Sequence, residues 1–276
     1  VVAVGGYVAT SWWSQVALFI GAIVVVMPIG LTGHSATGGS HDFGTNSLIW
    51  HLVAMLLWVG GLMALVAHAL RRGPHLTEAT RRYSMVALFS ILAMALSGVI
   101  NALVRVRISE LTEYSYGIVL IVKTVAIVLL GIIGYAHRER TIPLLDSQPK
   151  AFARLGAVEV LIMAAVSGLA VTLGRTPPPP PLDPNLTRMQ VKMGYNLSEQ
   201  ISWTNWITLW RPELLFSVIA ILLAVYYLRL VRRVDGWKTS RTVWWLLGCV
   251  TVVVTLSSGL GMHMPASYSV HMSVHM

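Results

Sequence analysis

The stretch SLIWHLVAMLLWVGGLMALVAHAL, residues 47–70, decides the class of fold. It contains no Asp, Glu, Lys or Arg and is longer than the about 20 apolar residues that a helix needs to cross a bilayer. In lipid a segment must satisfy its own backbone hydrogen bonds, which favours helices, and the alternating pattern of a membrane barrel is absent. We predict an all-α, polytopic transmembrane bundle with seven spans and the start of an eighth near 267, the spans being 12–31, 47–70, 83–103, 116–136, 152–173, 212–230 and 243–261.

The composition agrees with this prediction. Of 276 residues, 55% are hydrophobic and 11% are charged, whereas a soluble domain has about 25% charged residues. The formal net charge of +9 could indicate nucleic-acid binding. The basic residues, however, form short clusters between apolar runs, as membrane topology signals do. We therefore expect the lipid bilayer, and no nucleic acid, as a partner.

The basic clusters alternate along the chain and so predict an orientation. The positive-inside rule places the richer loops in the cytoplasm; these carry Arg71, Arg72, Arg81, Arg82, Arg138, Arg140, Lys150, Arg154, Arg229, Arg232, Arg233, Lys238 and Arg241. The opposite loops carry Arg105, Arg107, Arg175, Arg188, Lys192 and Arg211. We predict a multi-pass protein of a bacterial plasma membrane whose loops 32–46, 104–115, 174–211 and 262–266 face outward.

A run of five prolines, residues 177–181, divides the chain. Such a run forms a stiff polyproline II spacer. We predict a five-span domain at 1–174, an outer-side, proline-rich linker at 175–205 and a second domain at 206–276. Residues 267–276 indicate the opening of a helix and Val1 is not a start methionine, so we expect a longer parent protein.

The histidines are distributed unevenly over this topology. Six of the nine are predicted at the outer face, from both domains: His34, His41, His51, His263, His271 and His275. Because the orientation came from Lys and Arg alone, this is an independent observation. The other three, His68, His75 and His137, are predicted at the cytoplasmic side, where we interpret them as interfacial polar residues.

Methionines accompany the outer histidines. His51 and Met55 are four residues apart and so share a helix face, as do His271 and His275. Imidazole combined with thioether suits copper, and Cu(I) rather than Cu(II), whereas Mg²⁺ or Ca²⁺ would need oxygen ligands. No HExxH pattern of a zinc hydrolase is present, and we predict no enzymatic activity. The candidate metal ligands are His34, His41, His51, Met55, His263, Met264, His271, Met272, His275 and Met276.

Other residues inside the predicted spans, among them Cys249, Lys123 and Glu159, can have structural as well as functional roles. Methionine in a membrane helix is usually a packing residue, and Cys249 in its apolar run is best interpreted as a small packed side chain. Lys123 and Glu159 are ionisable residues within spans, which favours a functional role. Structural neutralisation, with Lys123 reaching outward and Glu159 paired with Arg138 or Arg154, is an equal alternative.

Several of these stretches resemble two known families. The stretch from Gly33-His34 through His41 and His51 to Trp58-Val59-Gly60-Gly61, with Lys123 and Arg154…Glu159, resembles the CopD copper-resistance and copper-uptake membrane domain over about residues 12–174. Residues 206–276, ending in His271-Met272-Ser273-Val274-His275-Met276, resemble the start of a CtaG-type cytochrome c oxidase assembly factor.

The resemblance implies copper movement and delivery to a haem–copper oxidase. We therefore predict a copper-binding or copper-transport protein that supports assembly of cytochrome c oxidase, with that oxidase or a respiratory supercomplex, and outer-side copper chaperones, as partners. One alternative is a b-type cytochrome with haem held axially by His51 and His271. Another is a non-catalytic accessory subunit of a respiratory oxidase complex.

Overall fold

The computed structural model describes residues 11–31, 38–140, 149–177, 179–180, 182–197 and 200–275, with backbone only for 137–140 and 149–155. The regular secondary structure of the described residues is helical, apart from a single β-bridge between Trp210 and Ser258. It separates into two compact units, of which unit 1 comprises 1–37 and 48–184 and unit 2 comprises 38–47 and 185–276. The boundary between the units falls inside a helix, so that ten residues from early in the chain belong to unit 2.

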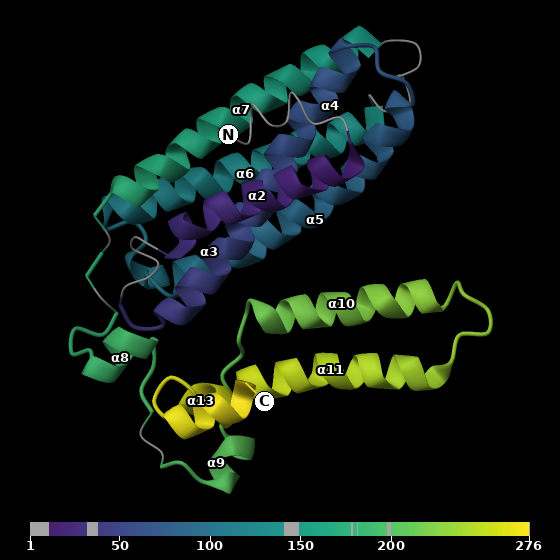
Figure 1. Ribbon diagram of the computed structural model, residues 1–276. Coiled ribbons are helices and arrows are strands. Elements are labelled where there is room, and N and C mark those ends of the chain that lie inside the picture. The colour runs from purple at the N-terminus through teal and green to yellow at the C-terminus, as the bar shows by residue number, and fades with distance from the viewer. Residues whose placement is uncertain are drawn as a thin grey trace. The chain divides into compact units, whose positions relative to one another are not determined.

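Unit 1 is a bundle of long helices (Figure 1). Its helices are α2 (Trp12–Leu31), the later part of α3 (His41–Met55), α4 (Gly61–Leu70), α5 (Leu76–Leu103), α6 (Ser115–Arg140) and α7 (Pro149–Arg175). A π-helical turn, Leu56–Gly60, joins α3 to α4 without a break. The core of the bundle is formed by Ala54, Trp58, Leu62, Val66, Met94, Leu130, Met163 and Val166.

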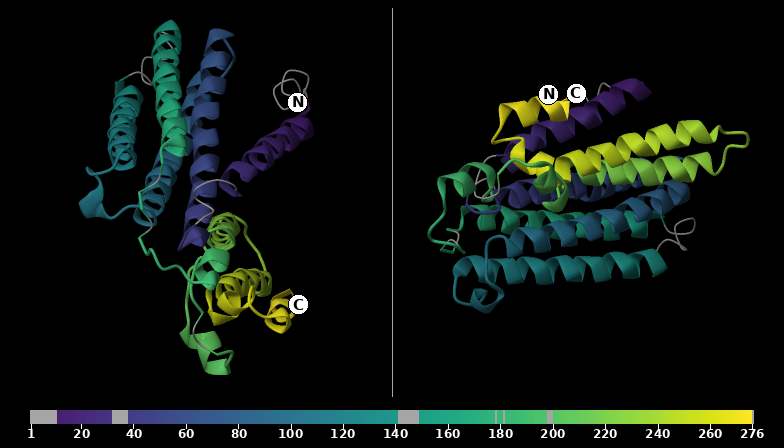
Figure 2. Two further views of the ribbon diagram at one scale, coloured as in Figure 1. Left: turned by 90° about the vertical axis from the view of Figure 1, so that its left-hand side faces the viewer. Right: turned by 90° about the horizontal axis from the view of Figure 1, so that it is seen from below.

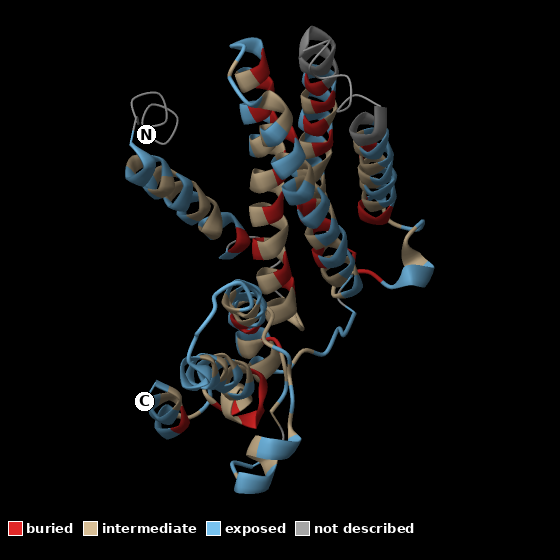
Figure 3. Ribbon diagram, turned by 90° about the vertical axis from the view of Figure 1, so that its right-hand side faces the viewer, coloured by how far each residue is buried: buried red, intermediate tan, exposed pale blue. Residues whose placement is uncertain are grey.

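Close helix packing in unit 1 depends on a small residue. α4 packs against α7, and a Cβ atom on Gly156 would lie 2.7 Å from a methyl group of Val66. By contrast, α2 buries only Gly30, and Figure 3 shows exposed or half-buried residues along almost all of its length. Such an apolar and exposed helix is compatible with a lipid environment.

Unit 2 is built on an antiparallel pair of helices, α10 (Phe216–Val231) and α11 (Thr239–Ser257). The pair lies side by side in each view (Figure 2). Four short helices complete the unit: α8 (Arg188–Met193), α9 (Trp203–Thr208), α12 (Gly259–His263) and α13 (Tyr268–His275). α12 begins where the Ser258 hydroxyl accepts a hydrogen bond from the Leu260 N–H.

The predicted all-helical architecture is confirmed for the residues that the structure describes. Six described helices are long and apolar enough to cross a bilayer, namely Trp12–Leu31, His41–Leu70, Leu76–Leu103, Ser115–Ala136, Gly156–Arg175 and Thr239–Ser257. The exact count of seven and part of an eighth is not confirmed. The predicted span at 212–230 contains the 16-residue helix α10, and the predicted start of an eighth span contains the 8-residue helix α13.

Candidate functional site

The most prominent feature of unit 1 is a cavity of about 550 Å³ inside the helix bundle. Helices α2, α3, α5, α6 and α7 and the π-helical turn contribute to its walls, which are mainly apolar. Its polar and sulfur-containing lining residues are His51, Met55, Met94, Asn101, Arg105, Tyr116, Lys123, Met163 and Ser167. A mainly apolar cavity with a few convergent polar groups is the usual form of a ligand site.

Hydrogen bonds determine which nitrogen of His51 faces a ligand. Nδ1 of His51 lies 3.1 Å from the Ser97 hydroxyl, and that hydroxyl donates its proton to the Met94 carbonyl. Because a hydroxyl has one proton, His51 must be the donor in the first contact. Nδ1 therefore carries the hydrogen in neutral His51, and the lone pair is on Nε2. A hydrogen bond at one ring nitrogen is also how metal-binding histidines are commonly oriented.

The Nε2 atom of His51 has a cation beside it. Lys123 Nζ lies 3.5 Å from Nε2, although the two residues are 72 positions apart in the sequence. Lys123 therefore turns toward the interior of unit 1 and contacts a candidate ligand. This contact was not predicted from the sequence, where Lys123 was considered as a transport residue or as a side chain reaching outward.

Three thioethers line the same cavity as His51. Met55 was predicted from its spacing of four residues on one helix face, whereas Met94 of α5 and Met163 of α7 were missed. Both missed residues are buried members of the core, and sequence reasoning had assigned methionines in spans to packing. Their position within predicted spans was the only sequence signal that they shared with His51.

The charged residues that line the cavity are both basic. Its described walls contain Lys123 and Arg105 and no carboxylate. At the end of α5, burial lowers the pKa of Arg105, and the nearby Tyr116 partly offsets this effect. The buried carboxylate of unit 1, Glu159, lines a separate cavity of about 140 Å³.

The two cavities of unit 1 meet at a shared wall. Trp58, Leu130 and Met163 line both of them and are 5%, 2% and 4% exposed. Trp58 lies in the π-helical turn, and its carbonyl accepts a hydrogen bond of 2.6 Å from the Tyr83 hydroxyl. The stretch Trp58-Val59-Gly60-Gly61, singled out in the sequence, is thus an irregular turn at this wall. π turns inside helices occur frequently at functional sites.

In unit 2, His263 is a buried residue of α12. Its side chain is 1% exposed, and its Nδ1 donates to the Gly259 carbonyl at 2.6 Å. Met264 follows it at the end of the same helix and is half-buried. His263 thus contributes to the core of unit 2, in contrast to the two histidines of α13.

His271 and His275 form a pair on α13. Their Nε2 atoms are 3.1 Å apart and their ring centroids 4.6 Å apart. Two bonds of about 2 Å from these nitrogens to one metal ion would meet at roughly 100°, which leaves other coordination positions open. Met272, beside the pair in sequence, is 41% exposed.

The remaining predicted ligands are less fully described. His41 begins α3 and belongs to unit 2, and its Nε2 is buried with no described hydrogen-bond partner. His34 and Met276 lie outside the described residues. His51 belongs to unit 1, whereas His41, His263, His271 and His275 belong to unit 2.

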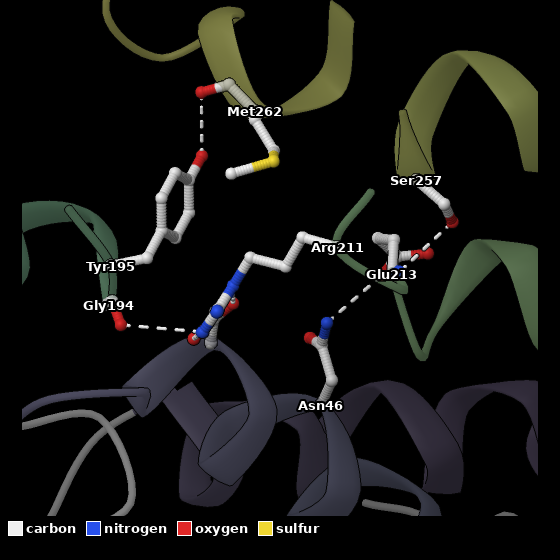
Figure 4. A network of polar contacts seen from close by, with 8 residues as sticks. Asn46, Gly194, Tyr195, Arg211, Glu213, Ser257 and Met262 are labelled. Carbon is white, nitrogen blue, oxygen red and sulfur yellow. Dashed lines mark hydrogen bonds and ion pairs between the residues drawn. The ribbon is translucent and has the colours of Figure 1, made fainter. Parts of the chain in front are cut away.

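Asp42, the carboxylate nearest to the outer histidines in the sequence, is held by Arg211. The guanidinium of Arg211 forms two hydrogen bonds with it, of 2.6 and 2.8 Å, and lies 4.3 Å from the ring centre of Phe43. Tyr195, also beside Arg211, donates its hydroxyl to the Met262 carbonyl (Figure 4). This network joins four separate segments of unit 2, and its bidentate ion pair occupies both carboxylate oxygens of Asp42.

Two limits on the chemistry follow from these positions. Within the described residues no group of three or more His, Cys, Asp or Glu side chains could hold a metal ion, so a metal in the cavity of unit 1 depends on thioether ligands beside His51. The cavity contains one described imidazole, whereas axial ligation of haem by two histidines needs a second.

Comparison with known proteins agrees with this chemistry. Residues 77–173 match the family model of copper resistance protein D, CopD. Residues 221–276 match that of the cytochrome c oxidase caa3 assembly factor, Caa3_CtaG. The CopD match includes Met94, Lys123 and Met163 and begins after His51.

Three relatives extend the comparison. The chain is 27% identical over 266 residues to an uncharacterised protein of Mycobacterium leprae, covering 94% of the chain and 38% of the relative. A Mycobacterium tuberculosis protein, also uncharacterised, is 27% identical over 275 residues, or 97% of the chain and 39% of the relative. The copper transport protein CutJ of Bacillus subtilis is 29% identical over 201 residues, or 69% of the chain and 36% of the relative.

The chain spans less than two fifths of the length of these curated relatives. No solved structure gives a significant match to the chain. The two family matches follow each other in the order predicted from the sequence. The chain therefore carries a segment of the copper resistance protein D type followed by a segment of the caa3 oxidase assembly factor type.

Proposed function

We propose that this membrane protein binds Cu(I) in the cavity of unit 1 and passes it on in support of cytochrome c oxidase assembly. One observation carries the proposal: the Nε2 lone pair of His51 and the thioethers of Met55, Met94 and Met163 belong to the lining of one cavity. Imidazole and thioether are ligands that suit Cu(I), and the lining contains none of the carboxylates that harder cations require.

The second part of the proposal concerns unit 2. Its histidines and methionines form a further copper-handling region, made up of His41, His263, Met264, His271, Met272, His275 and Met276. His34 keeps its separate proposed role of collecting copper at the outer face. The exposed His271–His275 pair is the point at which copper is exchanged. Matches to a copper resistance family, to an oxidase assembly factor family and to a protein named as a copper transporter support both parts.

The proposed setting is a bacterial plasma membrane with the histidine-rich side facing outward. This orientation is supported by the distribution of Lys and Arg between alternate loops. Copper would then arrive from chaperones outside the membrane, and the proposed recipient is cytochrome c oxidase or a respiratory supercomplex.

The first test is a Cu(I) titration of the purified chain against a coloured Cu(I) chelator. We expect His51→Ala to weaken Cu(I) binding in the cavity of unit 1 about tenfold or more. Each factor of ten in affinity corresponds to about 1.4 kcal/mol. His68→Ala is the matched control, because His68 lies outside the cavity and contacts the Pro74 carbonyl. Equal affinities for His51→Ala and the wild type would refute the site.

A second titration separates the two units. The double variant His271→Ala/His275→Ala should bind fewer copper ions per chain than the wild type. Its Cu(I) affinity at the cavity of unit 1 should be unchanged. Unchanged stoichiometry would remove the α13 pair from the proposal. In the same preparations, a Soret absorption band would favour a b-type cytochrome instead, and co-purification with the oxidase without any bound copper would favour an accessory subunit.

The role in oxidase assembly needs a cellular test. We expect deletion of the gene to lower the copper content of cytochrome c oxidase, and the wild-type gene to restore it. The His51→Ala variant should restore it less well than His68→Ala. Full oxidase copper content in the deletion strain at limiting copper would contradict the proposal.

A further inference from the structure

We propose that the ammonium group of Lys123 and a copper ion compete for the same atom, Nε2 of His51. This inference rests on the proposed function, because it concerns the same cavity. Lys123 Nζ lies 3.5 Å from Nε2, and no other hydrogen-bond or ion-pair partner of Lys123 is found among the described residues. When copper is absent, the ammonium group of Lys123 therefore blocks the position at Nε2 where copper would bind.

The geometry excludes simultaneous occupancy. An ammonium that donates to Nε2 lies along the lone pair of that nitrogen, which is also where a metal ion must bind. A metal–nitrogen bond is about 2 Å long, so a metal ion on that line would be only about 1.5 Å from the present position of Nζ. Lys123 must swing away before copper can bind His51.

Charge makes this competition stronger. The described cavity lining contains no carboxylate that could neutralise a displaced ammonium, and its other charged residue is the basic Arg105. Two like charges a few ångströms apart repel each other more strongly in the partly buried surroundings of a protein than in water. Even after displacement, Lys123 must therefore lower the affinity of the cavity for a metal cation.

Weak binding and ready release follow from the competition. When copper leaves, Lys123 can return and donate to Nε2, so that a half-buried imidazole is not left with an unsatisfied acceptor. Lys123 therefore stabilises the metal-free state and shortens the time for which copper is held. This behaviour suits a protein that transfers copper and would be a disadvantage in one that stores it.

The test compares Cu(I) affinity and release rate in the purified full chain. Lys123→Leu removes the competing cation, so we expect Cu(I) to bind about tenfold tighter or more and to leave correspondingly more slowly. Lys123→Arg is the matched control; it keeps the charge and should retain weak binding and fast release. Lys123→Gln keeps a neutral hydrogen-bond donor and should fall between these two variants.

A double-mutant cycle ties the effect to His51. In a His51→Ala background, Lys123→Leu should change Cu(I) affinity by a much smaller factor than in the wild type. If Lys123→Leu and Lys123→Gln bind Cu(I) as weakly as the wild type, competition is refuted while a copper site at His51 stands. Weaker binding by Lys123→Leu would also refute it, and would indicate that Lys123 recruits an anionic co-ligand. If His51→Ala by itself does not weaken Cu(I) binding, the proposed function is refuted instead.

Discussion

Tyr195 titrates under the influence of three features of unit 2. Burial, together with the Asp42 carboxylate, raises the pKa of Tyr195 to about 12, and the Arg211 guanidinium partly offsets this rise. The protonated phenol is therefore favoured in the folded state. Its contribution to stability is complete below the ordinary pKa of about 10 and is lost as the pH rises through about 12.

This leads to a prediction for Asp42→Asn. Without the carboxylate, Arg211 acts on Tyr195 unopposed, so the pKa of Tyr195 should fall below that in the wild type. The measurement is phenolate absorbance against pH, taken as the difference between proteins with and without Tyr195→Phe in each background. A pKa that rises, or stays at about 12, in Asp42→Asn would contradict the arrangement of this network.

The contact between α4 and α7 gives a prediction for a pair of helices. Gly156→Ala places a methyl group 2.7 Å from a methyl of the stiff Val66 side chain, and overpacking of this kind costs about 1–3 kcal/mol. Gly168→Ala, in the same helix, meets nothing within 4 Å and is the matched control. Thermal unfolding in detergent should show a loss of stability for Gly156→Ala alone.

For the whole molecule, the testable property is its orientation in the membrane. With Cys249→Ser as the background, a cysteine at Asp235, in the loop after α10, should react with a membrane-impermeant thiol reagent only from the cytoplasmic side. A cysteine at Thr112, between α5 and α6, should react from outside. The expectation follows from the basic residues of alternate loops, and labelling of both positions from one side would contradict it.

Much of the fold could be predicted because apolar length is a local property of the sequence. Residues 47–70 indicated one long helix, and the structure places α3, the π-helical turn and α4 there in continuous succession. The π-helical turn itself was not predicted. It depends on contacts such as the hydrogen bond from Tyr83 to Trp58, which joins residues 25 positions apart.

The candidate site was predicted only as far as one helix face allowed. His51 and Met55 share α3, so their spacing of four residues was informative. Met94, Lys123 and Met163 come from three other helices. The periodicity of one segment does not indicate which faces of different helices contact each other in the folded protein. Asp42 was noted as a carboxylate near the histidines, but its ion pair with Arg211 spans 169 positions and could not be inferred.

The separation between Asp42 and Arg211 has a consequence for synthesis of the protein. At about 5–20 residues per second, Arg211 leaves the ribosome roughly ten to thirty seconds after Asp42. Until then Asp42 lacks its ion-pair partner, although all of α5 and α6 has already been made. Unit 2 is therefore completed late in translation. If a ribosome stalls before residue 211, the first helices of the chain can assemble, but residues 38–47 lack the later residues of unit 2 with which they pack.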